Sequence, residues 1–370
     1  MSGESQSGIF LNFSKAEGRW SRLGSYYAMF PVTFAENVIS TRTDMGQTVI
    51  DPFCGRGTAP FVAMGMGRNA VGCDINPVAW LYSQTKINPH PVPSKVVERI
   101  TQVSLSVRAD EEEPEHEFQQ LAFCPRVLGF IRAARRTLDW RRDRLDRTVM
   151  TFLVHHLHDK IGSGLSNQLR HSRAMSPRYS INWWRRKGYD TAPEIDPRDF
   201  LIRRVQWRYA KGIAIPHSGL SRPVISLGNG AVSLPETAPM ANLILTSPPY
   251  SGVTNYRSDN WLRLWAMGEG PSLPDWDPEQ KFNDIDNYVD MLRGVFAATA
   301  KRARTDSTWY VRSDARAKTK DAIQSVLDVL LPNHQLEQLE APYKRKTQTA
   351  LYGDHEPKPG EVDLIYTPMQ

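Results

Sequence analysis

Short β-prone runs alternate with longer segments of helical spacing along most of this chain of 370 residues. The short runs predict buried strands, because apolar and β-branched residues follow one another in them. The segments between them place apolar residues three or four positions apart, as one face of a helix does. This alternation is typical of an α/β fold with a mostly parallel sheet. The predicted strands are Thr48–Ile50, Asn69–Cys73, Pro223–Leu227, Leu243–Leu245 and Thr308–Arg312.

Helices are predicted between and after these strands. One is opened by Pro31, since proline suits the first turn of a helix, and another by Pro77. Two late runs, Thr347–Tyr352 and Val362–Tyr366, flank a loop of glycine, proline and acidic residues, and they predict a closing antiparallel hairpin. The other predicted helices are Ala59–Met66, Tyr256–Met267, Asn287–Arg304 and Asp321–Leu331.

A long segment between the second and third predicted strands has a different pattern. Its helical spacing predicts one helix over Ser94–Val107 and one or two long helices over Arg126–Asp159. The acidic run Asp110–Glu117 between them is expected to be a solvated loop. We therefore expect an α/β domain, residues 1–90 and 222–370, and a mainly helical insertion, residues 91–221.

Positive charge gathers in this insertion. The whole chain has a net charge of +6, whereas residues 126–211 hold 20 basic and 8 acidic residues, a local balance of +12. Basic residues interleaved with aromatic and amide side chains suit contact with the phosphates and bases of a nucleic acid. The alternative is a solvated basic face over a core that holds Trp183 and Trp184. The candidates for nucleic-acid contact are Arg170, Arg173, Arg178, Tyr179, Trp183, Trp184, Arg185, Arg186 and Lys187.

Composition argues against several other classes of protein. Three cysteines make no disulfide framework and favour a reducing compartment. His155, His156 and His158 crowd one helical turn without the thiolates or carboxylates of a metal site, so no metal is expected. The N-terminus has no signal-peptide pattern, and no apolar run approaches the roughly 20 residues that span a bilayer. A soluble, cytoplasmic protein is expected.

The first candidate site is the segment Asp51-Pro-Phe-Cys-Gly-Arg-Gly-Thr58, between a predicted strand and a predicted helix. Gly55 and Gly57 permit positive φ and close approach of the backbone to a ligand, and the following helix N-terminus offers unpaired N–H groups. Asp74 ends the next predicted strand, where an acid binds a ribose diol in nucleotide-binding βαβ units. Asp74 can also serve as the N-cap of the helix at Pro77.

The second candidate site is Thr246-Ser247-Pro248-Pro249-Tyr250, which follows the strand at Leu243–Leu245. The prolines have fixed φ and no N–H group, so they end a central strand, and their carbonyl groups remain acceptors. A rigid turn with a hydroxyl before it and an aromatic face after it suits a planar ring that carries an amino group. The alternative is an ordinary turn at the end of a strand.

The two motifs together resemble those of the DNA amino-methyltransferases, which use S-adenosylmethionine and have a Rossmann-like class I sheet. The Ser-Pro-Pro-Tyr form is most similar to the cytosine-N4 branch, because adenine-N6 enzymes more often carry Asp or Asn where this chain has Ser247. The resemblance covers about 20–90 and 222–370. The segment Tyr26–Pro31 is similar to the motif that packs aromatic residues near the methionine part of the cofactor. Asn229 departs from the pattern, since an acidic residue that contacts adenine is usual there.

The resemblance implies transfer of a methyl group to the N4 amine of a cytosine flipped out of double-stranded DNA. Ser247 Oγ and the Pro248 carbonyl are expected to accept the N–H groups of that amine, and Tyr250 to stack on the base. Three alternatives remain open: an adenine-N6 enzyme, an RNA guanine-N2 enzyme and an inactive DNA-binding module. A cognate restriction endonuclease remains a candidate partner. The residues assigned to catalysis are Ser247, Pro248, Pro249 and Tyr250, and those assigned to the cofactor are Tyr27, Phe30, Asp51, Phe53, Gly55, Gly57, Thr58, Asp74, Asn229 and Thr246.

Overall fold

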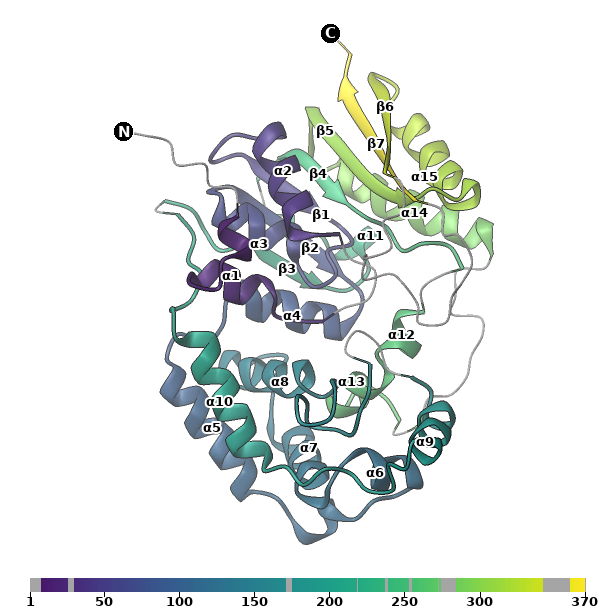
Figure 1. Ribbon diagram of the computed structural model, residues 1–370. Helices are drawn as coiled ribbons and strands as arrows, with labels where there is room; N and C mark the ends of the chain where they lie inside the picture. The colour runs from purple at the N-terminus through teal and green to yellow at the C-terminus, as the bar shows by residue number, and fades with distance from the viewer. Residues whose placement is uncertain are drawn as a thin grey trace.

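The computed structural model (Figure 1) describes most of the chain. The described residues are 8–25, 30–170, 175–217, 219–236, 239–252, 255–271, 273, 284–341 and 360–369. Within these ranges no helix is long and apolar enough to cross a bilayer.

One seven-stranded sheet organises the molecule, in the order β3-β2-β1-β4-β5-β7-β6. The strands from β3 to β5 are parallel to one another, and β7 runs antiparallel to both β5 and β6. This arrangement confirms a Rossmann-like class I sheet that is mostly parallel and ends in an antiparallel pair. The strands are β1 (Thr48–Asp51), β2 (Asn69–Asp74), β3 (Val224–Leu227), β4 (Ala241–Thr246), β5 (Ala303–Asp314), β6 (His334–Ala341) and β7 (Glu361–Pro368).

Helices cover both faces of the sheet, which explains the continuous apolar runs of its central strands. Along β4, Leu243 and Leu245 face one apolar cluster, whereas Ile244 faces a second cluster with Leu292 and Phe296. The first face is covered by α1 (Ala16–Ser21), α2 (Val32–Arg42), α3 (Thr58–Gly65) and α4 (Pro77–Ile87). The second face is covered by α11 (Gly230–Ser233), α14 (Ile285–Ala300) and α15 (Ala317–Leu330).

A group of helices between α4 and β3 gathers below the sheet in Figure 1. It consists of α5 (Pro93–Leu105), α6 (Glu117–Ala122), α7 (Pro125–Thr137), α8 (Arg144–His155), α9 (Pro177–Arg186) and α10 (Pro197–Tyr209). Two short 3₁₀ helices, η1 (Ile9–Leu11) and η2 (Ala109–Glu112), complete the described elements in the first half of the chain. After β4 the chain forms α12 (Tyr256–Asp259) and α13 (Trp261–Ala266). The latter packs on α7, and its Trp265 stacks on Phe123, which lies between α6 and α7, with ring centroids 6.1 Å apart.

The structure differs from the predicted elements in four places. The helix expected over Tyr256–Met267 breaks into α12 and α13 at Asn260, whose φ and ψ are −113° and 10°. The helix expected to reach Arg304 ends at Ala300, because β5 already begins at Ala303. The strand next to β7 is β6, and the predicted strand 347–352 lies outside the described residues. The acidic run 110–117 contains η2 and the start of α6 rather than only a solvated loop.

Candidate active site and cofactor site

The loop between β1 and α3 has the backbone conformation that its glycines predict. Gly55 has φ 50° and Gly57 has φ 75°, and Gly57 is the N-cap of α3. A Cβ atom on Gly57 would lie 2.6 Å from Ser83 Cβ, so a side chain there is excluded by space as well as by φ. The Cys54 N–H donates to the Cys73 carbonyl at 2.9 Å and ties the loop to β2. The loop is therefore a fixed turn that presents its backbone at the carboxyl end of the sheet.

Asp74, at the end of β2, holds this loop through its carboxylate. The Gly55 N–H donates to Asp74 Oδ2 and the Asn76 N–H donates to Asp74 Oδ1, both at 2.8 Å. Burial raises the pKa of Asp74 to about 6, against the two backbone hydrogen bonds, which lower it. The expected N-cap role belongs to Asn76 instead, because its side chain accepts from the Val78 N–H at 2.9 Å.

Asp51 joins the two candidate motifs. It is 1% exposed at the end of β1, and its Oδ1 accepts the Thr246 hydroxyl at 2.7 Å and the Phe53 N–H at 3.2 Å. Burial raises the pKa of Asp51 to about 7, and the nearby Asp74 carboxylate acts in the same direction. Thr246 is fully buried, and its hydroxyl orients the Asp51 carboxylate through this hydrogen bond. The end of β4 is thereby fixed to the start of the glycine loop.

The Ser-Pro-Pro-Tyr turn leaves β4 directly after Thr246. Pro248 and Pro249 are buried, whereas Ser247 and Tyr250 are partly exposed. Burial raises the pKa of the Tyr250 hydroxyl, and a hydrogen bond with the Ser247 side chain opposes this rise. The structure therefore brings the two polar side chains of the motif together at one end of the sheet.

Three charged residues next to this turn were not found by sequence reasoning. Arg312 on β5 donates from Nε to Asp363 Oδ1 at 2.7 Å and from Nη2 to Asp363 Oδ2 at 2.8 Å. Its Nη1 also pairs with Glu361 Oε2 at 3.3 Å. The guanidinium lies 3.4 Å from the ring centroid of Phe34, and the Glu361 charge further raises the pKa of Tyr250. The only signal in the sequence was an arginine that ends a predicted strand.

The remaining residues assigned to the cofactor lie at different depths. Phe30 is buried and packs edge-on against Phe34, and Phe53 packs against a helix of the second face. Thr58 is buried at the start of α3, and its hydroxyl has no hydrogen-bond partner in the described part of the chain. The exposed Asn229 caps α11 by accepting from the Ala231 N–H at 2.9 Å. Tyr27 lies outside the described residues.

The candidate DNA-contacting residues divide into a surface set and one core residue. Trp184 is fully buried, and its Nε1–H donates to the Gln168 carbonyl at 3.1 Å, so it belongs to the core that the alternative interpretation foresaw. Trp183 is partly buried against Tyr189, and Arg170 is also partly buried. Arg173 lies outside the described residues. The exposed members are Arg178, Tyr179, Arg185, Arg186 and Lys187, on or next to α9.

Histidines and cysteines take structural positions in the described ranges. No group of three histidine, cysteine, aspartate or glutamate residues there has the arrangement of a metal site. His158 makes a 3.0 Å contact from Nδ1 to the Arg170 carbonyl, and His155 Nε2 lies 3.2 Å from Arg208 Nη2. The three cysteines are buried free thiols, and burial raises the pKa of Cys54 and Cys73. Burial therefore disfavours the thiolate form of Cys54 and Cys73.

Comparison with known proteins finds a family match over the segment that contains the first motif. Residues 4–84 match the family described as DNA methylase. The chain is 12% identical to the rRNA methyltransferase aviRa from Streptomyces viridochromogenes, covering 98% of this chain and 94% of that one with a TM-score of 0.36. It is 10% identical to TrmN from Thermus thermophilus, covering 97% of this chain and 53% of that one, also with a TM-score of 0.36. No curated protein matches the chain significantly.

The family match covers 81 of the 370 residues, including the glycine loop and Asp74, and S-adenosylmethionine is the cofactor that it implies. The site has the groups that this cofactor needs. Asp74 ends the second strand, the position at which an acid binds a ribose diol in nucleotide-binding βαβ units, and the buried Thr58 hydroxyl has no hydrogen-bond partner among the described residues. Burial raises the pKa of Asp51, and no cationic side chain in the described ranges opposes this rise, so the methionine ammonium of the cofactor would fit beside it.

Proposed function

We propose that this protein methylates the exocyclic N4 amine of cytosine in double-stranded DNA, by direct in-line displacement from S-adenosylmethionine. The supporting observation is the joined geometry of the two motifs. The Thr246–Asp51 hydrogen bond of 2.7 Å fixes Ser247 and Tyr250 next to the cofactor loop. Nucleophile and methyl group must be about 3–3.5 Å apart and aligned, so such a rigid link between the two half-sites favours the reaction.

The chain would activate the amine by hydrogen bonding. The lone pair of an exocyclic amine is delocalised into the ring, and acceptors on its N–H groups favour a tetrahedral nitrogen with a usable lone pair. Ser247 Oγ and the Pro248 carbonyl are the acceptors that we assign to this role. A serine favours cytosine over adenine as the target, since the resembling adenine enzymes more often carry Asp or Asn at this position.

The cofactor supplies an electrophilic methyl group on a sulfonium when it is bound. Gly55 and Gly57 would accommodate it by close backbone approach, with Asp74 on its ribose and Asp51 beside its ammonium group. The amine becomes acidic only after transfer, so water can take its proton and no strong general base is needed. No covalent bond to the enzyme is required, which agrees with the buried thiols.

Tyr250 would hold the target base outside the duplex. The amine cannot be reached within stacked DNA, so the base is expected to flip at a cost of a few kcal/mol. An aromatic face offsets part of this cost by stacking, worth about 1–3 kcal/mol for a base. The exposed basic residues on and next to α9 are proposed to contact the DNA backbone.

Identification of the modified nucleoside tests this proposal directly. The protein is incubated with S-adenosylmethionine and duplex DNA, the DNA is digested to nucleosides, and the products are identified by mass spectrometry. We expect N4-methylcytosine, at a level that falls in the Ser247→Ala variant. N6-methyladenine as the sole product would replace cytosine by adenine as the target, and DNA without any methylated nucleoside would refute the proposal.

A further inference from the structure

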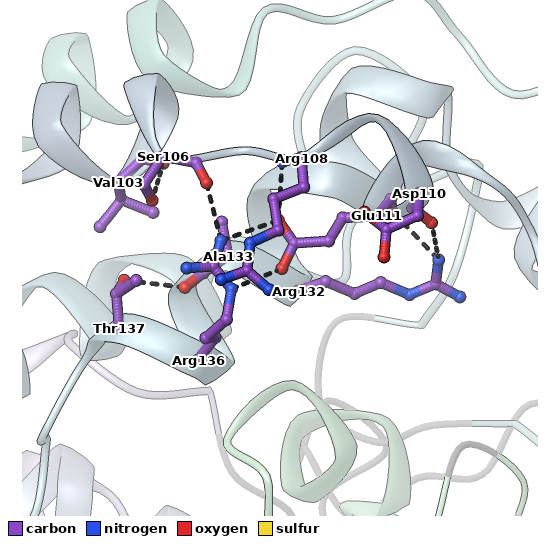
Figure 2. A network of polar contacts seen from close by, with 9 residues as sticks. All are labelled: Val103, Ser106, Arg108, Asp110, Glu111, Arg132, Ala133, Arg136 and Thr137. Atoms are coloured by element: carbon purple, nitrogen blue, oxygen red, sulfur yellow. Dashed lines mark hydrogen bonds and ion pairs between the residues drawn. The ribbon is translucent and has the colours of Figure 1, made fainter.

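Three arginines on α7 line an open pocket that the proposed reaction does not use. The pocket has a volume of about 290 Å³ and is lined by Arg132, Arg135, Arg136 and Gly268. The arginines lie three and four positions apart, so they project from the same side of the helix. The contacts of Arg132 and Arg136 are drawn in Figure 2.

Two of these arginines are held by neighbouring acceptors (Figure 2). Arg136 donates from Nε and Nη2 to the two carboxylate oxygens of Glu111, at 2.9 and 3.0 Å, and from Nη2 to the Ser106 carbonyl at 2.7 Å. Arg132 donates from Nη1 to the Glu111 carbonyl at 3.1 Å and pairs through Nη2 with Glu115 at 3.1 Å. Their positions are therefore fixed, and two carboxylates balance their charges.

Arg135 differs because no side-chain or backbone acceptor in the described part of the chain takes a hydrogen bond from its guanidinium. The guanidinium lies over the ring of Trp265, 5.2 Å from the centroid, and Trp265 is 1% exposed. Burial lowers the pKa of Arg135, so its surroundings leave this charge incompletely solvated. A guanidinium positioned over an indole ring still has N–H donors that can bind an oxyanion.

Gly268 also lines the pocket and places no side chain in it. It follows α13, has φ 81°, and a Cβ atom placed on it would meet nothing within 4 Å. Helix α13 follows the Ser-Pro-Pro-Tyr turn closely in the chain, since 10 residues separate Tyr250 from Trp261. Arg136 and Arg132 are paired with Glu111 and Glu115, whereas Arg135 has no ion pair of its own within the described ranges and can meet the negative charge of a phosphodiester.

We propose that this pocket binds one backbone phosphate of double-stranded DNA, with Arg135 as the residue that contacts the phosphate oxygens. This inference rests on the proposed function in taking DNA as the substrate. It adds a contact site on α7 to the exposed residues around α9. The pocket then anchors the DNA on a helix that packs directly on α13, the helix that follows the catalytic turn.

The salt dependence of DNA binding tests the proposal. Binding of the full chain to a fluorescent duplex is measured by anisotropy from 50 to 300 mM NaCl, with S-adenosylhomocysteine present so that no methyl transfer occurs. Arg135→Gln is expected to weaken binding about tenfold and to reduce the slope of log K against log salt by about 0.9, the value for one phosphate contact. Arg126→Gln is the matched control, because Arg126 is exposed on the same helix and does not line the pocket. Equal slopes and affinities for the two variants would overturn the proposal.

A second pair of variants keeps the test decisive if Arg135→Gln disturbs the packing of Trp265. Gly268→Asp would place a carboxylate in the pocket, and Gly268→Asn would place a neutral side chain of the same shape there. Asp and Asn both tolerate positive φ better than other residues, so the backbone strain is matched. We expect the aspartate variant to bind DNA at least tenfold more weakly than the asparagine variant, and equal affinities would contradict the phosphate site.

The failure of this inference is distinguishable from the failure of the proposed function. If the pocket is correct and the chemistry is wrong, Arg135→Gln still lowers the salt slope, but digested DNA contains no methylated nucleoside. If the chemistry is correct and the pocket is wrong, N4-methylcytosine forms, while DNA binding by Arg135→Gln matches that of Arg126→Gln.

Discussion

Replacing Asp51 by asparagine should stabilise the protein without its cofactor. Asparagine has nearly the same shape, and its carbonyl oxygen can accept the same hydrogen bonds from the Thr246 hydroxyl and the Phe53 N–H. The substitution removes a carboxylate that is only 1% exposed and that has no cationic partner in the described part of the chain. A buried charge of this kind opposes folding whenever it is ionised.

The magnitude follows from the pKa of Asp51, which rises from 3.8 to about 7 on folding. Each pKa unit corresponds to about 1.4 kcal/mol, so ionising Asp51 in the folded protein costs about 4 kcal/mol more than in the unfolded chain. Because the folded pKa is the higher one, the folded state holds the proton more tightly. The contribution of Asp51 to stability is therefore fully present below pH 3.8 and is lost as the pH rises through about 7.

Urea denaturation of Asp51→Asn and wild-type protein at pH values from 4 to 8 measures this difference. The two proteins should be nearly equal in free energy of unfolding at pH 4, and the variant should be up to about 4 kcal/mol more stable at pH 8. Asp190→Asn, a change at an exposed residue, is the control and should stay within about 0.5 kcal/mol at every pH. A variant that is less stable than the wild type at pH 8, or a difference that does not change with pH, would refute the reasoning.

The same substitution should weaken the binding of S-adenosylhomocysteine, which carries the same ammonium group as the cofactor. Binding near pH 6.5 should release protons from wild-type Asp51, because an ammonium partner lowers its pKa. Calorimetry in two buffers of different ionisation enthalpy measures this release. The release should vanish in Asp51→Asn, and an equal release from both proteins would assign the protons to another group.

Three further predictions concern the turn, the glycine loop and the charged residues on β5 and β7. Ser247→Ala should lower the single-turnover methylation rate about 10²-fold and leave S-adenosylhomocysteine affinity within twofold, and an equal loss of both would contradict the division of roles. Gly57→Ala should cost about 1–3 kcal/mol in urea denaturation, because of φ 75° and the 2.6 Å approach to Ser83, and a neutral change would mean that the loop relaxes freely. Arg312→Met should cost about 3–5 kcal/mol by leaving Asp363 buried and unpaired, and the double variant with Asp363→Leu should recover part of the loss. If the double variant were no more stable than Arg312→Met, the loss would not come from the unpaired carboxylate.

The sequence predicts the part of the site in which local pattern and spacing decide the structure. The glycine loop, Asp74 and the Ser-Pro-Pro-Tyr turn each follow an apolar strand, and the carboxyl ends of parallel strands meet at one edge of the sheet. Which of two adjacent tryptophans is buried was not predictable, because helix phase and partner helices decide it. Trp184 faces the interior while Trp183 is only partly buried.

Long-range pairing sets the limit of prediction from sequence. The Arg312–Asp363 pair joins residues 51 positions apart, and nothing in either local sequence identifies its partner. The strand β6 also escaped prediction, since its sequence His334–Ala341 is rich in glutamine and glutamate and lacks a β-prone run. Its place in the sheet depends on the ladder of hydrogen bonds with β7.

The packing of α13 on α7 decides which parts of this chain could be exchanged between related enzymes. Cutting at the ends of residues 91–221 would remove α7 but leave α13 behind, with Trp265 losing its contacts to Phe123 and Arg135. A functional chimaera should therefore transfer residues 256–270 together with the insertion. The unit of exchange is discontinuous in sequence, and a recombination event that replaced the insertion alone would expose the apolar side chains of α13 that pack on α7.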